Sequence, residues 1–448
     1  MTARAWPISR VTPSRPSPAA ALICAMLLLS PQAALAQFKQ ERQKLVGAGA
    51  LGAAGQGYSV ALSADGDTAI VGGPLDHDNR GAAWVFTRRG GVWTQQGKKL
   101  VGTPSVGFFG AGALQGWSVA LSANGDTAIV GGPDDDLQPP GHFTGAAWVF
   151  TRSGGVWTQQ SKLVGTTTAN GPAQLGFSVA LSADGDTAIV GGLDDNLGPS
   201  GYNVGVAWVF TRSRGVWTQQ SIKLVGAGAV AQPLLSASVA LSADGDTAIL
   251  GGPSANIDSS GLSVGATWVL TRSGVVWTQQ GGKLVGTRAV GPAEQGAAVA
   301  LSADGDTAIA GGPTDNFGLS GYGVGATWVF TRSGAAWAQQ GKKLVGTGAA
   351  GNAEQGYSVA LSADGDTAVA GGPHDNADAG AAWVFTRSGD VWTQLGGKLV
   401  GTDPSGNAEQ GYSVALSANG DTAIVGGPHD NGDAGAAWVF VRPSAASP

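Results

Sequence analysis

The sequence predicts an all-β fold, a seven-bladed β-propeller of four-stranded antiparallel blades, whose ring is closed by an N-terminal strand that completes the last blade. Three observations support this prediction. A unit of about 60 residues recurs seven times. The chain contains 75 glycines and only 12% charged residues, a balance typical of turn-rich β structure. No stretch shows the periodicity of an amphipathic helix.

Each copy of the unit contains a tryptophan in a segment similar to Ala-Ala-Trp-Val-Phe. These tryptophans are Trp84, Trp148, Trp208, Trp268, Trp328, Trp383 and Trp438. In the first copy, alternating and apolar runs predict four strands, at residues 58–63, 68–72, 82–87 and 92–101. Asp65-Gly66 predicts a tight hairpin between the first two strands, and Pro74 ends the second because it has no amide hydrogen.

The two ends of the chain complement each other. The seventh copy stops after its third strand and lacks a fourth. Phe38 stands seven residues before Leu45, as Trp93 stands seven before Leu100 in a complete copy. We therefore expect residues 38–46 to pair with the third strand of the last copy, which would leave no open sheet edge in the ring.

The first 36 residues have the pattern of a signal peptide. Three arginines precede an apolar run at residues 19–29, and Ala34-Leu35-Ala36 matches a signal peptidase site. The domains expected are therefore a signal peptide at 1–36 and the propeller at 37–448. Removal of the signal takes the only cysteine and leaves 22 basic and 31 acidic residues, a charge of −9. We expect an exported protein, periplasmic, secreted or on the cell surface, that binds no nucleic acid and keeps no transmembrane segment.

Thirteen tryptophans recur, seven on the predicted third strands and six on the fourth. Although they resemble stacking platforms for sugars, we interpret them as core between blades, because large aromatic side chains dominate core burial. Trp117 differs, since it stands at the start of a first strand where other copies have Tyr58, Phe177, Tyr357 or Tyr412.

An aromatic after glycine, as in Gly57-Tyr58, and Gly-Gly-Pro at residues 72–74 recur through the copies. With these features the chain resembles the bacterial FG-GAP repeat proteins and, more distantly, the integrin α-subunit propeller, over residues 38–442. The resemblance implies a propeller fold but no single function.

The resemblance also raises calcium binding between the first two strands of a blade. The calcium-binding loop of the family offers an Asp-x-Asp-x-Asp-Gly-x-x-Asp spacing, whereas residues 63–68 offer two carboxylates. Calcium needs six to eight oxygen ligands, so these loops lack the full ligand set. We interpret Asp67 and its counterparts as turn residues instead. The counterparts are Asp126, Asp186, Asp246, Asp306, Asp366 and Asp421.

The loops between the second and third strands hold all four histidines, and the resemblance implies that ligands meet this face. His77, His374 and His429 belong to copies 1, 6 and 7, which the closed ring would make neighbours. Together with aspartates they could form a metal or acid/base cluster. However, the aspartate after Gly-Gly-Pro recurs in six copies, which favours a turn role. The candidate ligand-binding residues are Asp76, His77, Asp78, His142, Tyr202, Tyr322, His374, Asp375, Asp378, His429, Asp430 and Asp433.

Three functional hypotheses follow. The first is an exported binding or adhesion module that recognises a glycan or protein through this loop face. The second is a metal-assisted hydrolase or lyase that uses His77, His374 and His429. The third is a passive envelope or matrix protein. The sequence contains no nucleophile elbow, zinc-protease motif or phosphate-binding loop, so it does not indicate an enzyme by motif.

Overall fold

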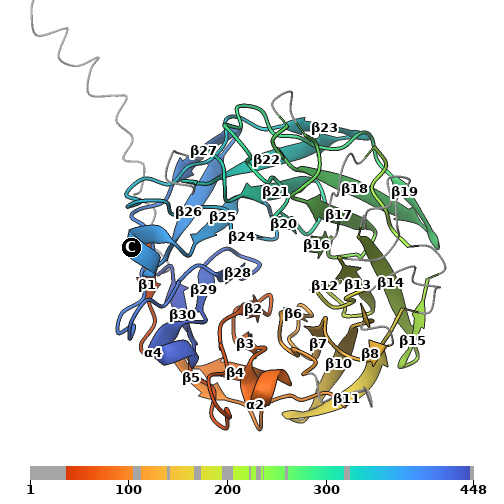
Figure 1. Ribbon diagram of the computed structural model, residues 1–448, viewed down its shortest axis with the longest axis vertical. Helices are drawn as coiled ribbons and strands as arrows, with labels where there is room; N and C mark the ends of the chain where they lie inside the picture. The colour runs from red at the N-terminus through yellow and green to blue at the C-terminus, as the bar shows by residue number, and fades with distance from the viewer. Residues whose placement is uncertain are drawn as a thin grey trace, which may run out of the picture. The chain divides into compact units, whose positions relative to one another are not determined.

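A computed structural model describes residues 37–103, 112–138, 142–165, 173–193, 205–220, 223–228, 234–235, 237–257, 261–316 and 323–443. Residues 37–443 form one compact unit, in which seven four-stranded antiparallel sheets surround a central axis (Figure 1). The predicted seven-bladed propeller is therefore confirmed. The predicted signal peptide, residues 1–36, lies outside the described residues.

Each blade runs from an inner strand at the axis to an outer strand at the rim (Figure 1). The inner strands are β2 (Ser59–Leu62), β6 (Ser118–Leu121), β12 (Ser178–Leu181), β16 (Ser238–Leu241), β20 (Ala298–Leu301), β24 (Ser358–Leu361) and β28 (Ser413–Leu416). The second strands are β3 (Thr68–Gly73), β7 (Thr127–Gly132), β13 (Thr187–Gly192), β17 (Thr247–Gly252), β21 (Thr307–Gly312), β25 (Thr367–Gly372) and β29 (Thr422–Gly427).

The third strands are β4 (Ala82–Arg89), β10 (Ala146–Ser153), β14 (Val206–Ser213), β18 (Ala266–Ser273), β22 (Ala326–Ser333), β26 (Ala381–Ser388) and β30 (Ala436–Val441). The outer strands are β5 (Val92–Gln95), β11 (Val156–Leu163), β15 (Val216–Gln219), β19 (Val276–Gln279), β23 (Ala336–Gln339), β27 (Val391–Gln394) and β1 (Lys39–Gln40). A small hairpin of β8 (Leu137–Gln138) and β9 (His142–Phe143) extends a loop of blade 2.

The hydrophobic core lies between adjacent blades. All seven third-strand tryptophans are at most 2% exposed, as predicted. Between blades 7 and 1, for example, Trp84 and Phe86 pack with Ile424 and Val439. Glycine permits the close contact near the axis, because a Cβ on Gly72 would lie 2.2 Å from a carbonyl oxygen of the next blade.

The outer strands differ from the prediction. The ladder of β5 ends at Gln95, and the chain returns to the sheet only at an isolated bridge between Ala83 and Leu100. Blade 2 alone has a continuous outer strand, β11, with a bulge opposite β10. It has one residue fewer between its tryptophan and the following leucine, so pairing continues with Gln160 alone left out, as the bulge. Five of the six outer-strand tryptophans are only partly buried, so the core interpretation holds for them in part.

In the hairpin between the inner and second strands, the two aspartate side chains have different roles. The Asp65 side chain accepts hydrogen bonds from the Ser63 hydroxyl and the Asp67 amide, and so forms the turn. Asp67 instead pairs with Arg88 on the third strand of the blade. Since all seven blades repeat this ion pair, the interpretation of these aspartates as turn residues is corrected.

The N-terminal segment closes the ring as predicted. Lys39 and Gln40 pair with Val441 and Phe440 of β30, and Leu45 bridges to Ala437. Phe38 is 9% exposed, in the position that tryptophan takes in other outer strands.

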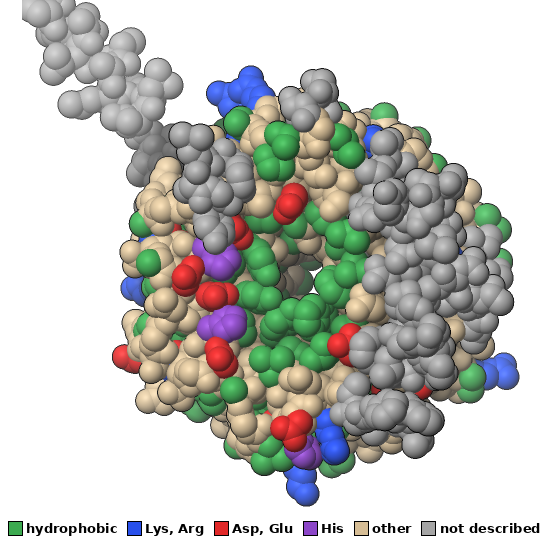
Figure 2. Space-filling model, viewed as in Figure 1, with side chains coloured by type: hydrophobic (Ala, Val, Ile, Leu, Met, Phe, Trp, Pro, Cys, Tyr) green, Lys and Arg blue, Asp and Glu red, His purple; other side chains and the backbone are tan. Residues whose placement is uncertain are grey.

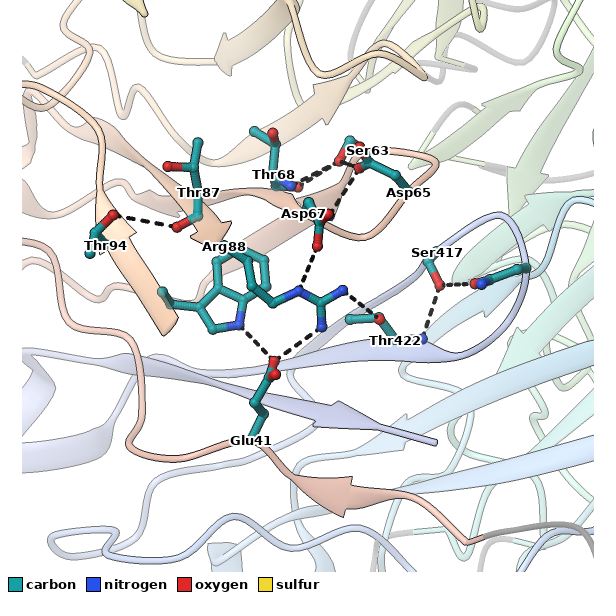
Figure 3. Close-up of polar contacts among 12 residues, drawn as sticks. Glu41, Ser63, Asp65, Asp67, Thr68, Thr87, Arg88, Thr94, Ser417 and Thr422 are labelled. Atoms are coloured by element: carbon teal, nitrogen blue, oxygen red, sulfur yellow. Dashed lines mark hydrogen bonds and ion pairs between the residues drawn. The ribbon is translucent and has the colours of Figure 1, made fainter. Parts of the chain in front are cut away.

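Glu41 joins the closing segment to blade 1 (Figure 3). Its Oε2 accepts hydrogen bonds from Arg88 Nη1 and Trp93 Nε1, both at 3.1 Å. Five of the other six junctions have a glutamine where Glu41 stands, as Gln96 does beside Trp157, and the junction of blades 6 and 7 has Leu395. The closing segment therefore reproduces the contacts of an ordinary outer strand.

Deletion of residues 37–47 should destabilise the whole ring. It removes two buried apolar side chains, the β1 ladder and the Glu41 contacts, a loss on the order of 5 kcal/mol. A thermal melt should show a large drop in the transition midpoint. Glu41→Gln is the control, because it installs the residue found at other junctions and should change stability by less than about 1 kcal/mol. An unchanged melt for the deletion would contradict the closing role.

Candidate functional site at the channel mouth

Three short loops of blades 1, 6 and 7 carry the predicted histidine sector. Each contains a four-residue segment, α2 (Asp76–Asn79), α3 (Asp375–Asp378) or α4 (Asp430–Asp433). Two residues inside each segment have left-handed backbone conformation, so these are tight turns rather than regular helices. The loops of adjacent blades are joined by backbone hydrogen bonds, from the Glu409 amide to the Asp378 carbonyl and from the Gly55 amide to the Asp433 carbonyl.

His374 and His429 occupy equivalent positions and make equivalent contacts. His374 Nδ1 lies 2.9 Å from Asp378 Oδ1, and its Nε2 lies 3.6 Å from Glu354 Oε2. His429 Nδ1 lies 2.7 Å from Asp433 Oδ1, and its Nε2 lies 3.5 Å from Glu409 Oε2. Each imidazole is thus held between two carboxylates at the surface of the loop face.

His77 does not join this arrangement. In blade 1 the position of His374 and His429 is taken by Leu75, and His77 aligns with Asn376 and Asn431. Its side chain is exposed, and it forms no ion pair with any residue that the structure describes. Asp78 is likewise exposed and follows it in left-handed conformation. The ring makes the three loops neighbours, but only two histidines share a chemical environment.

The aspartates directly after Gly-Gly-Pro-x hold the loops in place. Asp375 is 1% exposed, its Oδ1 accepts the Ala350 amide, and its Oδ2 pairs with Lys398. Both oxygens are therefore engaged within the protein. We assign these aspartates to loop structure rather than to ligand contact. The equivalent pairs are Asp76–Lys99, Asp135–Lys162, Asp315–Lys343 and Asp430–Lys44.

Three further predicted residues cannot be placed in the site. The backbone of His142 belongs to β9, but its side chain lies outside the described part of the structure. Tyr202 and Tyr322 lie outside the described residues altogether.

The sequence interpretation missed three glutamates at corresponding positions of blades 5, 6 and 7, two of which, Glu354 and Glu409, lie beside the histidines. Glu294, Glu354 and Glu409 each stand in left-handed conformation, with φ of 53° to 55°, in the turn that enters an inner strand. Burial is the main cause that raises the pKa of each carboxyl. For Glu354, His374 lowers the pKa, whereas the negative charges of Glu294 and Glu409 raise it. The recurring Glu-Gln-Gly of copies 5, 6 and 7 was the available sequence signal.

An arc of aromatic rings lies at the axis, next to the histidines. The rings come from the residue that precedes each inner strand in blades 6, 7, 1, 2 and 3. Successive ring centroids are 4.6 to 5.4 Å apart, in the order Tyr357, Tyr412, Tyr58, Trp117, Phe177. All five side chains are partly buried, and burial raises the pKa of the three tyrosines. The equivalent residues of blades 4 and 5 are alanines.

This face is hollowed at its centre. Figure 2 shows hydrophobic side chains around the hollow, with acidic and histidine side chains beside them on one side. The Tyr412 ring contacts His429 edge-on, with the ring centroids 6.5 Å apart, so the two features are continuous. A pocket of about 470 Å³ opens between the loops of blades 6 and 7, lined by Gly351, Asn352, His374, Ala377, Asp378 and Glu409.

The geometry permits binding chemistry more directly than metal chemistry. Among the residues that the structure describes, no three His, Cys, Asp or Glu side chains are grouped so that they could hold a metal ion. Partly exposed aromatic rings, carboxylates and imidazoles together offer stacking, hydrogen bonds and negative charge to a ligand. No helix within the described part is long and apolar enough to cross a membrane.

The fold and this loop face define a seven-bladed propeller with one chemically distinct sector. A family model for the FG-GAP repeat matches residues 392–440, from the outer strand of blade 6 to the third strand of blade 7. This match confirms the resemblance drawn from the sequence, and the chain is consistent with an FG-GAP repeat protein. No curated protein matches the chain. Fold and repeat together indicate a binding or adhesion-type module.

A double-mutant cycle should show that Asp375 and Lys398 are coupled in the free energy of unfolding. Asp375→Ala leaves a half-buried ammonium and a loop amide without a partner, so we expect a loss of about 3 kcal/mol in the free energy of unfolding. The double variant with Lys398→Met should recover much of that loss. Asp366→Ala, which breaks the exposed pair with Arg387 in the same blade, should cost less than about 1 kcal/mol. Equal losses in urea denaturation for both single variants would contradict the assignment.

Glu354→Gln should stabilise the protein at neutral pH and not at acid pH. A carboxyl whose pKa is raised by folding contributes stability below its unfolded pKa and loses it as the pH rises through its folded pKa. At pH 7 the ionised group therefore opposes folding, and its neutral replacement should gain less than about 1 kcal/mol. The gain should vanish below the ordinary carboxyl value of 4.5. Urea denaturation across this range measures it, with Asp78→Asn on an exposed loop as control.

Proposed function

We propose that the protein is an exported binding or adhesion module whose protein or glycan ligand docks on the loop face at the channel mouth. The aromatic arc carries this proposal. Five contiguous rings remain partly accessible at the axis, although the fold does not need them there, since Ala237 and Ala297 fill the same position in blades 4 and 5. Partly exposed aromatic side chains are enriched where proteins bind partners.

The histidine and carboxylate sector supplies polarity beside the arc. Asp378, Asp433 and the two histidines they contact are half-exposed, so their remaining hydrogen-bonding capacity faces solvent. Such groups fix the orientation of a ligand whose apolar part stacks on the rings. These histidine contacts occur in blades 6 and 7, so they distinguish one side of the pseudo-symmetric ring. A bound ligand would therefore adopt one orientation.

Export is supported by the sequence pattern of residues 1–36. An extracellular glycan or protein is then the partner to expect, and the acidic balance of the chain disfavours nucleic acid. The geometry does not favour the metal-assisted hydrolase, because His77 stands apart from His374 and His429. Among the described residues, no three potential metal ligands lie close enough together to hold an ion.

Binding should be measured on a glycan array and on a panel of extracellular matrix proteins. The variant Trp117→Ala/Tyr412→Ala removes two rings of the arc but installs the residue that blades 4 and 5 already have, so the fold should persist. We expect it to weaken the binding of any ligand found by at least about tenfold.

Arg89→Ser is the matched control for this experiment. Arg89 is exposed on the hairpin between β4 and β5, where the corresponding residues of blades 2 to 6 are serines, so binding should be unchanged. Failure of every glycan and protein to bind would instead support a passive structural role. Binding that is insensitive to the loss of both rings would place the ligand elsewhere.

A further inference from the structure

We infer that the rim of the ring carries a second kind of site, a repeated pocket between neighbouring outer strands that takes an acidic sugar. Pockets of about 300 and 290 Å³ occur at two junctions that are not adjacent, between blades 1 and 2 and between blades 4 and 5. The first is lined by residues at the ends of β5 and β11 and the second by residues at the ends of β19 and β23, which are outer strands at the rim of the ring (Figure 1). This site is independent of the channel mouth.

The two pockets are built from equivalent residues. The first is lined by residues 96–100 of blade 1 and by Gly155, Val156 and Trp157 of blade 2. The second is lined by residues 280–284 of blade 4 and by Ala335, Ala336 and Trp337 of blade 5. The two pockets therefore occupy corresponding positions of the repeat.

Each pocket presents a tryptophan fixed in one orientation. Trp157 Nε1 donates to Gln96 Oε1 at 2.9 Å, and the Arg152 guanidinium covers the ring at 5.4 Å from its centroid. Trp337 is held in the same way by Gln280 at 2.8 Å and by Arg332. Both rings are only partly buried, and their remaining surface borders the pocket. A rigid, partly open indole is the group on which the apolar face of a sugar ring stacks.

An exposed apolar side chain extends the tryptophan surface. Val156 is 63% exposed and lines the first pocket. Exposed valines also precede the tryptophans of blades 1, 3, 4 and 6. Core packing does not require an apolar residue at this exposed position, because the side chain points away from the blades' shared core. A ligand with an apolar ring face would cover it.

The charge of the pockets indicates which kind of sugar they would bind. Neither lining contains a carboxylate, and each contains lysine. Lys98 is exposed and has no ion pair among the described residues. Lys283 lacks the buried aspartate partner of other blades, because blade 4 has Ala255 there. Within the described part of the chain its Nζ donates one hydrogen bond, to the Gly228 carbonyl at 3.4 Å. A lining lysine with no carboxylate partner among the described residues, Lys98 in the first pocket and Lys283 in the second, complements the carboxylate of a uronic acid.

The blade 4 tryptophan provides an internal comparison. Trp277, at the junction of blades 3 and 4, is 7% exposed, so its ring offers little surface to a ligand. Val276 precedes it and is 52% exposed. A substitution at Val276 therefore changes the same strand position without touching an open indole.

The test is a nuclear magnetic resonance titration of the full protein with trigalacturonic acid, and with maltotriose as the neutral match. We expect the acidic sugar to shift the indole N–H signals of Trp157 and Trp337, which the variants Trp157→Phe and Trp337→Phe identify. The double variant Val156→Asp/Ala336→Asp places an anion in each pocket on an exposed residue, so the fold should be kept while the affinity falls by at least about tenfold. Val276→Asp should leave both shifts unchanged.

The opposite results would overturn the inference. These are no shift of either indole signal with trigalacturonic acid, equal shifts with maltotriose, or equal suppression of the shifts by Val276→Asp. Thermal melts of the variants verify folding before each titration. Because the rim variants leave the aromatic arc intact, the outcome is separate from that of the channel-mouth experiment.

Discussion

The non-covalent closure of the ring is the constraint on which the rest of the structure depends. A propeller has no free sheet edges only when its last blade is completed, and here the first strand of the chain completes it. The closing segment also supplies Lys44, which pairs with the buried Asp430 and thereby holds the loop that carries His429. One half of the histidine sector is therefore formed by residues almost 400 positions apart, and it exists only when the whole ring is closed.

Internal pairing explains why most of the repeated polar residues are not available for function. The aspartate of every inner hairpin meets an arginine, and the aspartate after Gly-Gly-Pro-x meets a lysine wherever both are described. The candidate site consists of residues that differ between blades and keep part of their surface exposed. They are the glutamates of blades 5 to 7, two histidines, and aromatic rings that give way to Ala237 and Ala297.

Local patterns explain which parts could be predicted from the sequence. Strand alternation, the Asp65-Gly66 hairpin and the spacing from Phe38 to Leu45 are short-range features, and they gave the blades and the ring closure correctly. The lysine partner of Asp375 lies 23 residues away, beyond the reach of turn chemistry. The arc from Tyr357 to Phe177 can be recognised only from the order of the blades around the closed ring. His77 stands two positions after the place of His374 and His429, which Leu75 occupies in blade 1. These contacts are set by tertiary structure rather than by neighbours in the chain.

Unfavourable interactions at the loop face support its assignment as the ligand-binding face. The hairpin aspartates and arginines of all seven blades lie close to an opposite charge, as Arg88 does to Asp67 and Glu41. Around Glu354, by contrast, like charges and burial raise the pKa of a carboxyl held in left-handed conformation. A non-glycine residue in that conformation costs free energy that the surrounding fold must offset. Leu114, Gln174 and Leu234 adopt the same conformation in blades 2 to 4, so the carboxyl group is what distinguishes blades 5 to 7. A cationic or hydrogen-bonding group of a ligand would offset the cost of its partly buried charge.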